Sequence, residues 1–146
     1  MEDSDKNSPL DATTGNAAGL KKGQRATVIL DLSDLTDRLG GDRDLIEMFL
    51  EDLKVVMMEE LFRQLAELRA HVDRGEADTV QRAAHSLKGS AANLSATALY
   101  DAVCELEDWT KLRKLEQIRN PLAKVEQELE RLRNFVASAG FAERPL

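Results

Sequence analysis

Apolar residues recur every three or four positions over most of this chain, which is the spacing of one face of an α-helix. The longest such stretch lies between Asp42 and Gly75, and its apolar positions are Leu45, Phe49, Leu53, Val56, Leu61, Leu65, Leu68 and Val72. Aspartate is a good N-cap, and glycine commonly follows the last turn of a helix. The pattern therefore predicts one long helix that Asp42 caps and that ends near Gly75.

A short helix is predicted before this one, and three longer helices after it. The short helix begins with a cap at Asp31 or Ser33 and runs to Leu39, where two glycines break it. The first of the later helices runs from residue 76 or 78 to about 94, and the second from residue 95 to 111–113. The last helix is indicated by apolar residues that recur between positions 115 and 136.

The last helix contains a proline. Either the regular helix begins at Pro121 with Asn120 as its N-cap, or Pro121 kinks a longer helix, and the sequence leaves both open. No stretch alternates as a β-strand does, so the sequence predicts an all-α protein, an antiparallel four-helix bundle with a short extra N-terminal helix. We expect the bundle to span residues 27–139, between a disordered N-terminal tail (1–26) and a frayed C-terminus (140–146).

Composition and charge narrow the possible functions. With 146 residues, 42% of them hydrophobic and 32% charged, the chain suffices for one domain and is too short for a kinase plus a relay module. Its net charge of -7 argues against nucleic acid as a partner. No apolar run has the length of a membrane span and no signal peptide is recognisable, so we expect no membrane partner and a cytoplasmic location. The single cysteine, Cys104, has no companion for a disulfide or metal site and is expected to be a packing residue.

The candidate chemistry lies in residues 82–93, RAAHSLKGSAAN, which contain His85. On a helix, five residues fall within roughly 60° of this histidine: Gln81, Arg82, Lys88, Gly89 and Ala92. The far side of the same helix is apolar and consists of Val80, Ala83, Leu87, Ala91 and Leu94. The spacing therefore predicts a solvent-exposed imidazole beside one cation and two residues that leave the backbone nearly bare.

This arrangement favours phosphoryl transfer. An imidazole has an unperturbed pKa of about 6.5, so one ring nitrogen carries a free lone pair near neutral pH. A phosphoryl group that passes to this nitrogen spreads negative charge over its oxygens, and the ammonium of Lys88 one turn away would stabilise that charge. Because a glycine within a helix costs about 1 kcal/mol relative to alanine, we expect Gly89 to serve the close docking of a partner.

The motif His85-Ser86-Leu87-Lys88-Gly89, followed by small residues, resembles that of histidine-containing phosphotransfer (Hpt) domains. The lead-in Leu39-Gly40-Gly41-Asp42 and the later pair Leu106-Glu107 are similar to that family too. The resemblance covers roughly residues 31–138, and the motif around the histidine is its specific part.

One position departs from the family pattern. Where the family usually has glycine after the pair Asn93-Leu94, this chain has Ser95. Serine is a good N-cap, so we expect Ser95 to cap the helix that follows.

The resemblance implies a four-helix bundle whose exposed histidine relays phosphoryl groups between aspartates of receiver domains. His85 would be the phosphorylated residue, Lys88 the charge-stabilising neighbour, and Gly89 with Ala92 the docking gap. The partners would be receiver domains of a hybrid sensor histidine kinase, of a response regulator, or of both, in a two-component signalling pathway. Because the sequence has no kinase or nucleotide-binding motif, the chain would be a carrier and not an enzyme. It would hold no metal or cofactor of its own, and Mg²⁺ would come with the receiver domain.

Other interpretations of these residues stay open. Lys88 is alternatively a solvated lysine, and Gly89 a packing glycine that lets two helices approach. Gln81 and Arg82 either contact a phosphate or a partner's acidic rim, or are solvated polar positions. Glu107 either accepts a hydrogen bond from the imidazole N–H, which would fix the reacting nitrogen, or is a solvated helix glutamate.

Two other functions stay open as well. A pure interaction bundle would bind its partners without phosphorylation of His85. A helical enzyme or metal protein would use His85 as a base or ligand, for which the sequence offers only Glu107 and Asp78 as companions. His71 lacks comparable surroundings and is expected to be an ordinary surface or capping histidine near a helix C-terminus.

Overall fold

A computed structural model describes residues 28–138, and every regular element among them is helical. In chain order these elements are α4 (Leu32–Arg38), α5 (Arg43–Asp52), the π-helical turn η1 (Leu53–Met57), α6 (Met58–Asp73), α7 (Ala77–Asn93), α8 (Thr97–Lys111), the 3₁₀ turn η2 (Leu115–Gln117) and α9 (Arg119–Ala137). The predicted all-α class is confirmed. The predicted tail (1–26) and the predicted frayed end (140–146) lie outside the described residues.

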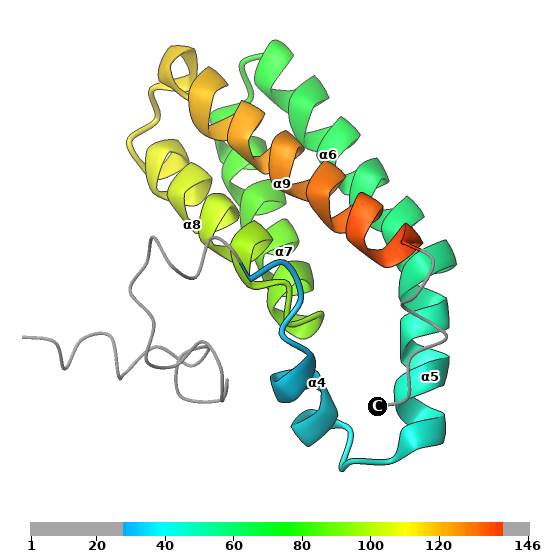
Figure 1. Cartoon of the computed structure of the whole chain (residues 1–146). Helices are drawn as coiled ribbons and strands as arrows, with labels where there is room; N and C mark the ends of the chain where they lie inside the picture. The colour runs from blue at the N-terminus through cyan, green and yellow to red at the C-terminus, as the bar shows by residue number, and fades with distance from the viewer. Residues whose placement is uncertain (1–27, 139–146) are drawn as a thin grey trace, which may run out of the picture.

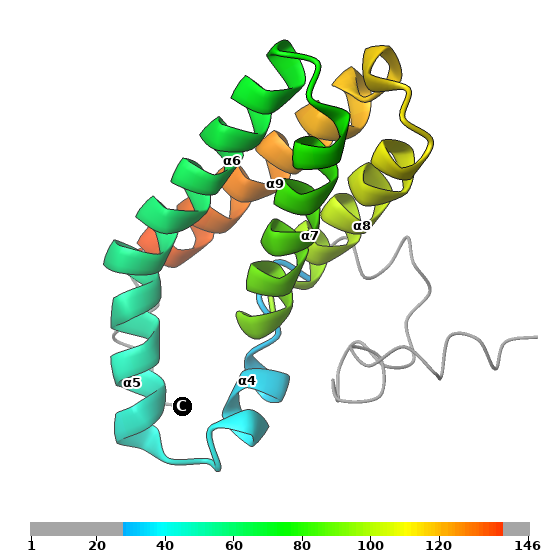
Figure 2. The same ribbon diagram turned by 180° about the vertical axis from the view of Figure 1, so that it is seen from behind.

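Helices α6, α7, α8 and α9 form an antiparallel four-helix bundle (Figure 1). Helix α6 packs along α7, α7 along α8, and α8 along α9. Helix α9 also contacts α6, which closes the bundle. Helices α4 and α5 extend from one end of the bundle, and the view from behind shows the short connection between them (Figure 2). Helix α4 is the predicted extra N-terminal helix.

Helix α7 buries one face between α6 and α8. The side chains on this face are completely buried: Val80, Ala84, Leu87 and Ala91. Burial of one leucine side chain contributes about 2 kcal/mol, and alanines allow neighbouring helices to approach closely. The opposite face of α7 therefore lies at the surface of the bundle.

The long helix has the predicted limits, but η1 interrupts it and shifts its buried face. Leu45 and Val56, which the pattern placed on one apolar stripe, are 46% and 62% exposed. In η1 the amide of Met58 donates a hydrogen bond to the carbonyl of Leu53, and both side chains are buried. This π turn takes up one extra residue and so rotates α5 relative to α6. The buried residues of α5 are Ile46 and Leu50.

The predicted N-caps of the first two helices are confirmed. The side chain of Asp42 accepts hydrogen bonds from the amides of Asp44 and Leu45 at 3.0 and 3.2 Å. Of the two residues predicted to cap the short helix, Asp31 does so, since its carboxylate accepts from the amide of Asp34 at 3.0 Å. The two glycines between these helices have φ of 69° and 72°, a conformation that favours glycine.

Helix α9 begins at Arg119, two residues before the proline. Pro121 therefore lies in the first turn, where the amide that it lacks has no helical partner to lose. The cap position is held by Ile118 without a side-chain hydrogen bond, so the alternative in which Asn120 caps a helix that begins at Pro121 is wrong.

Ser95 does not cap α8 as predicted. Helix α8 begins at Thr97 with Ala96 as its cap residue, and Ser95 has a φ of 56°, the left-handed conformation that favours glycine. Its buried hydroxyl donates a hydrogen bond to Asp34 at 2.7 Å and accepts one from Arg38 at 2.9 Å. Two hydrogen bonds with α4 thus offset the strain of a residue other than glycine in the turn between α7 and α8.

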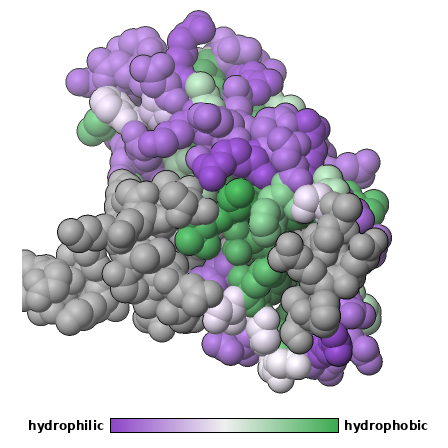
Figure 3. Space-filling view, viewed as in Figure 1, coloured by the Kyte–Doolittle hydropathy of each residue, from purple (hydrophilic) through white to green (hydrophobic). Residues whose placement is uncertain are grey.

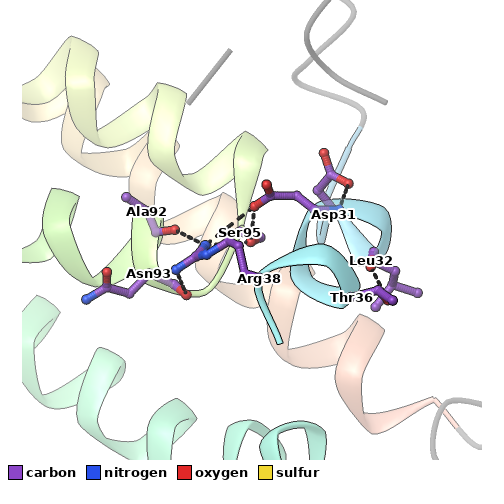
Figure 4. A network of polar contacts seen from close by, with 8 residues as sticks. Asp31, Leu32, Thr36, Arg38, Ala92, Asn93 and Ser95 are labelled. Atoms are coloured by element: carbon purple, nitrogen blue, oxygen red, sulfur yellow. Dashed lines mark hydrogen bonds and ion pairs between the residues drawn. The ribbon is translucent and has the colours of Figure 1, made fainter. Parts of the chain in front are cut away.

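Arg38 extends this contact to the end of α7, as Figure 4 shows. Its guanidinium donates to the carbonyls of Ala92 and Asn93, both at 3.1 Å. These carbonyls belong to the last turn of α7, where helical partners are missing and positive charge is favourable. We call Asp34, Arg38 and Ser95 the α4 latch, because together they hold α4 on the C-terminal end of α7.

Apolar surface gathers toward the end of the molecule that carries α4 and α5. On the face seen in Figure 3, hydrophilic residues cover most of the bundle and hydrophobic residues lie lower down, toward these two helices. The exposed large apolar side chains of α5 and η1 are Leu45, Met48, Val55 and Val56.

The latch predicts an order of stability for two substitutions of Ser95. Ser95→Ala keeps the left-handed backbone and deprives the buried Asp34 carboxylate of a donor, so we expect it to lower the free energy of unfolding by about 2 kcal/mol. Ser95→Gly loses the same hydrogen bonds but relieves about 1 kcal/mol of backbone strain, so it should be the less damaging of the two. Urea unfolding followed by circular dichroism measures both values, and an alanine variant as stable as the unsubstituted protein would contradict the latch.

Candidate functional site

His85 lies on the outer face of α7 and is open to solvent. Its side chain is 70% exposed, whereas Ala84 and Leu87 beside it in sequence are completely buried. Helix α7 is continuous over Ala77–Asn93, and the α4 latch holds its C-terminal end. The imidazole is thus accessible from solvent but is carried by a packed helix.

Glu107 of α8 lies against the ring and bridges two residues of α7. Its Oε2 is 2.9 Å from Nδ1 of His85, and its Oε1 is 2.7 Å from Nζ of Lys88. The side chain of Glu107 is only 6% exposed and that of Lys88 26%. The interpretations of Glu107 and Lys88 as solvated helix residues are therefore wrong. We call His85, Lys88 and Glu107 the histidine cluster.

The electrostatics of the cluster favour an ionised pair. Burial is the strongest single influence on the carboxyl of Glu107 and acts to raise its pKa, but the hydrogen bonds from Lys88 and His85, together with the positive charges of Lys88 and Lys111, outweigh it and lower the pKa. The hydrogen bond to Glu107 raises the pKa of Lys88 against the opposing effect of burial. Near neutral pH the cluster therefore contains a carboxylate and an ammonium whose charges balance.

The ionised carboxylate also selects the tautomer of His85. A carboxylate only accepts hydrogen bonds, so the 2.9 Å contact requires the hydrogen to lie on Nδ1. In the neutral ring Nε2 then carries the free lone pair. The site thus presents one defined nitrogen as a nucleophile.

A surface hollow extends from His85 toward the N-terminus of α7. It is lined by Asp78, Gln81, Arg82, His85, Ser86 and Glu107. Asp78 pairs with Arg113 at 2.6 Å, and this hydrogen bond lowers the pKa of the Asp78 carboxyl. The predicted site residues Gln81 and Arg82 thus share one hollow with the imidazole, and Arg82 remains exposed.

On the other side of His85, one turn further along α7, the surface is nearly bare. Gly89 is exposed, and a Cβ added to it would meet nothing within 4 Å. The alternative that Gly89 lets two helices of the domain approach each other is therefore wrong. Ala92, three residues after Gly89, is half-buried, and its carbonyl accepts a hydrogen bond from Arg38.

An apolar groove lies between the α5–α6 helix and the C-terminal end of α7. Its lining residues are Phe49, Val56, Met57, Glu60, Leu61, Gln64, Ser90, Asn93 and Leu94. Gln64 and Ser90 approach each other across it at 3.3 Å. Periodicity alone assigned Val56 to the core and did not reveal this groove, because a π turn has no sequence signature that such a pattern detects.

The remaining candidates have ordinary surroundings. His71 lies in the last turn of α6, where its Nδ1 is 2.7 Å from the carboxylate of Glu76. Cys104 is half-buried, and burial raises the pKa of its thiol, which fits a packing residue. Among residues 28–138, no group of three histidine, cysteine, aspartate or glutamate residues is arranged to hold a metal ion. Within the same range, no helix combines the length and the apolar character that crossing a bilayer requires.

A family model described as the Hpt domain matches residues 44–135, which run from α5 to the last turns of α9 and include the histidine cluster. Neither the curated proteins nor the solved structures gave a match to the chain.

The ion pair of the cluster predicts a pH-dependent effect of Lys88→Met. Because the folded protein lowers the pKa of Glu107, the pair contributes stability that is complete above the ordinary value of 4.5 and is lost as the pH falls through the lower folded value. We expect the variant to lose about 2 kcal/mol of unfolding free energy at pH 7. This loss should shrink below pH 4.5, and the pKa of Glu107 should rise in a ¹³C NMR titration.

Lys124→Met is the matched control for this substitution. Lys124 pairs with Glu105 of α8 at 3.5 Å, but both side chains are exposed, so its loss should change stability little at any pH. An equal loss for Lys88→Met at pH 3 and pH 7 would contradict the assigned ion pair.

Proposed function

Because the chain belongs to the Hpt domain family, whose members carry phosphoryl groups on a histidine in phosphorelays, we propose that His85 is the phosphorylated residue. The observation that carries this proposal is the exposed imidazole with Nδ1 held by the buried carboxylate of Glu107. That contact leaves Nε2 free to attack and orients the ring before a partner arrives.

The proposed step is in-line transfer from an aspartyl phosphate of a receiver domain. The lone pair of Nε2 forms a bond to phosphorus as the bond to the aspartate oxygen breaks, and the aspartate leaves as a carboxylate. Lys88 stabilises the charge on the transferred group. An ammonium has three N–H donors, and Glu107 occupies one of them, so two remain for phosphoryl oxygens.

The partners of this step are receiver domains, which Hpt domains contact in phosphorelays. We infer that a receiver of a hybrid sensor histidine kinase supplies the phosphoryl group and that a response regulator accepts it. The receiver brings Mg²⁺ and most of the catalytic groups, since this chain has no glycine loop that cradles phosphate.

The docking surface surrounds His85 along α7. Gly89 and Ala92 leave room for close approach of the receiver backbone, and the apolar groove next to them adds surface that loses water on contact. In the hollow on the opposite side of the ring, Gln81 and Arg82 offer polar contacts to the rim of the receiver or to the phosphoryl group.

Substitution of His85 tests the proposal directly. The protein is incubated with a panel of receiver domains carrying labelled aspartyl phosphate, and the label transferred to it is followed. We expect an acid-labile, alkali-stable label that His85→Gln abolishes, while the exposed position of the ring leaves the helical circular dichroism unchanged. His71→Gln is the matched control and should be labelled normally. If partners bind and signal through His85→Gln as through the unsubstituted protein, the chain is an interaction bundle and not a carrier.

We expect substitution of Gly89 by alanine to raise the stability of the protein but to slow phosphoryl transfer. Since an added Cβ meets nothing within 4 Å, Gly89→Ala should raise the free energy of unfolding by about 1 kcal/mol through helix propensity. The same substitution should slow transfer from a receiver, and Gly89→Gln should slow it further, because the side chain occupies the docking gap.

Ala123→Gln on α9 is the control for this pair. It places the same side chain on an exposed helix position of α9, which does not carry the histidine cluster, and should leave transfer unchanged. Urea unfolding and the rate of label transfer measure the two effects. Transfer by Gly89→Gln at the normal rate would remove Gly89 from the docking surface.

A further inference from the structure

We propose that Glu107 keeps a proton on Nδ1 of phosphorylated His85, so that the phosphoryl group stays transferable above neutral pH. This inference rests on the proposed phosphorylation of His85 and adds a role that requires the negative charge of Glu107. An uncharged acceptor at this position would orient the ring equally well. Glu107 is thus a positioning residue that acts through the histidine, on the proton of the nitrogen that does not react.

The contacts of Glu107 fix its carboxylate against the ring. One oxygen lies 2.9 Å from Nδ1 of His85 and the other 2.7 Å from Nζ of Lys88, so both oxygens are engaged. The side chain is 6% exposed, and the hydroxyl of Thr110 donates to the backbone carbonyl of Glu107 at 2.6 Å. The carboxylate therefore has little freedom to turn away when the state of the ring changes.

The transfer step shows where the proton matters. When Nε2 forms its bond to phosphorus, the Nδ1 hydrogen remains in place and the ring becomes a cation beside the Glu107 carboxylate. In the return step the nitrogen–phosphorus bond breaks, its electron pair goes back to Nε2, and the leaving group is a neutral imidazole. If Nδ1 had lost its proton, the leaving group would be an imidazolate, which is far more basic and leaves slowly.

The carboxylate disfavours loss of this proton in two ways. Its negative charge stabilises the cationic ring, because the contacting oxygen lies only 2.9 Å from Nδ1. A carboxylate also has no hydrogen to donate, so a deprotonated Nδ1 would face an oxygen lone pair at 2.9 Å without a hydrogen between them. A glutamine side chain has the same shape but can present its NH₂ group instead.

The other charged groups that line the hollow or interact with Lys88 and Glu107 do not replace Glu107. On α7 they are Lys88, Arg82 and Asp78, and on α8 they are Asp108, Lys111 and the weakly acidic thiol of Cys104. Lys88 is bound to the far oxygen of Glu107 and Asp78 to Arg113. On the α6 side of α7, the carboxylate of Glu60 pairs with Arg63. Among the described residues, Nδ1 of His85 donates its hydrogen bond to the carboxylate of Glu107.

The test compares how fast phosphohistidine is lost at different pH. The full chain is phosphorylated with phosphoramidate, the donor is removed, and the phosphohistidine signal is followed by ³¹P NMR between about pH 5 and pH 10. Loss is fast while the ring carries the Nδ1 proton and slows once that proton is gone. We expect this transition to lie about one pH unit lower in Glu107→Gln, which makes loss about tenfold slower at alkaline pH than in the unsubstituted protein.

Two further variants make this result specific. Glu105→Gln removes the same charge from α8, but its carboxylate pairs with Lys124 and not with the ring, so its profile should match that of the unsubstituted protein. Lys88→Met leaves the charge of Glu107 uncompensated and should move the transition to higher pH. Opposite shifts in Glu107→Gln and Lys88→Met cannot both come from a general loss of structure, which circular dichroism monitors in parallel.

The outcomes separate this inference from the proposed function. Coincident profiles for Glu107→Gln, Glu105→Gln and the unsubstituted protein, all phosphorylated on His85, would overturn the inference and leave the relay function intact. If neither phosphoramidate nor any receiver of the panel phosphorylates His85, the proposed function is wrong and this inference falls with it. A transition at lower pH in Glu107→Gln, with an unchanged transition in Glu105→Gln, supports the role of the carboxylate charge.

Discussion

The site depends on how α7 is packed between α6 and α8. Val80, Leu87 and Ala91 are completely buried and fix the rotation of α7 about its own axis, since a shift by one residue would turn the helix by about 100°. The outward direction of His85 is therefore a consequence of hydrophobic burial on the opposite face. Polar contacts at the site only adjust a ring that the core already holds toward solvent, which is why an exposed side chain can still have a defined orientation.

The same packing places Glu107 at the edge of the core. Leu106 and Thr110 on α8 are completely buried, and the carboxylate between them is carried against the outer flank of α7. A buried carboxylate is costly unless it is paired, and here two charge-assisted hydrogen bonds to α7 compensate for its desolvation. The three residues of the histidine cluster therefore depend on one another. Removal of Glu107 would leave His85 without the acceptor that orients its ring, and removal of Lys88 would leave the buried Glu107 carboxylate without its cation.

The sequence predicted those features that depend on local spacing, and it left open or missed those that depend on tertiary contacts. The apolar stripe opposite His85 and the cap at Asp42 follow from residues within a few positions of each other. Glu107 contacts His85, which lies 22 residues earlier in the chain. No local pattern distinguishes this buried glutamate from a solvated one. Ser95 adopts a left-handed backbone because Asp34, 61 residues earlier, accepts its hydroxyl hydrogen, and this outweighs the preference of serine for an N-cap.

A relay carrier meets a donor and an acceptor at one nitrogen, so its own groups must serve both directions of transfer. In the resting cluster the charges of Glu107 and Lys88 cancel, so in the proposed relay an incoming phosphoryl dianion would meet neither a net anion nor a cation strong enough to trap it. In the proposed relay, the orientation of the ring serves both steps, and the retained proton keeps a neutral imidazole as the leaving group of the return step. In that proposal, groups that favour one direction of transfer belong to the receivers, each of which would supply its own metal and aspartate. The helices that hold the cluster are packed before any partner binds, and this suits a surface that successive receivers use in turn.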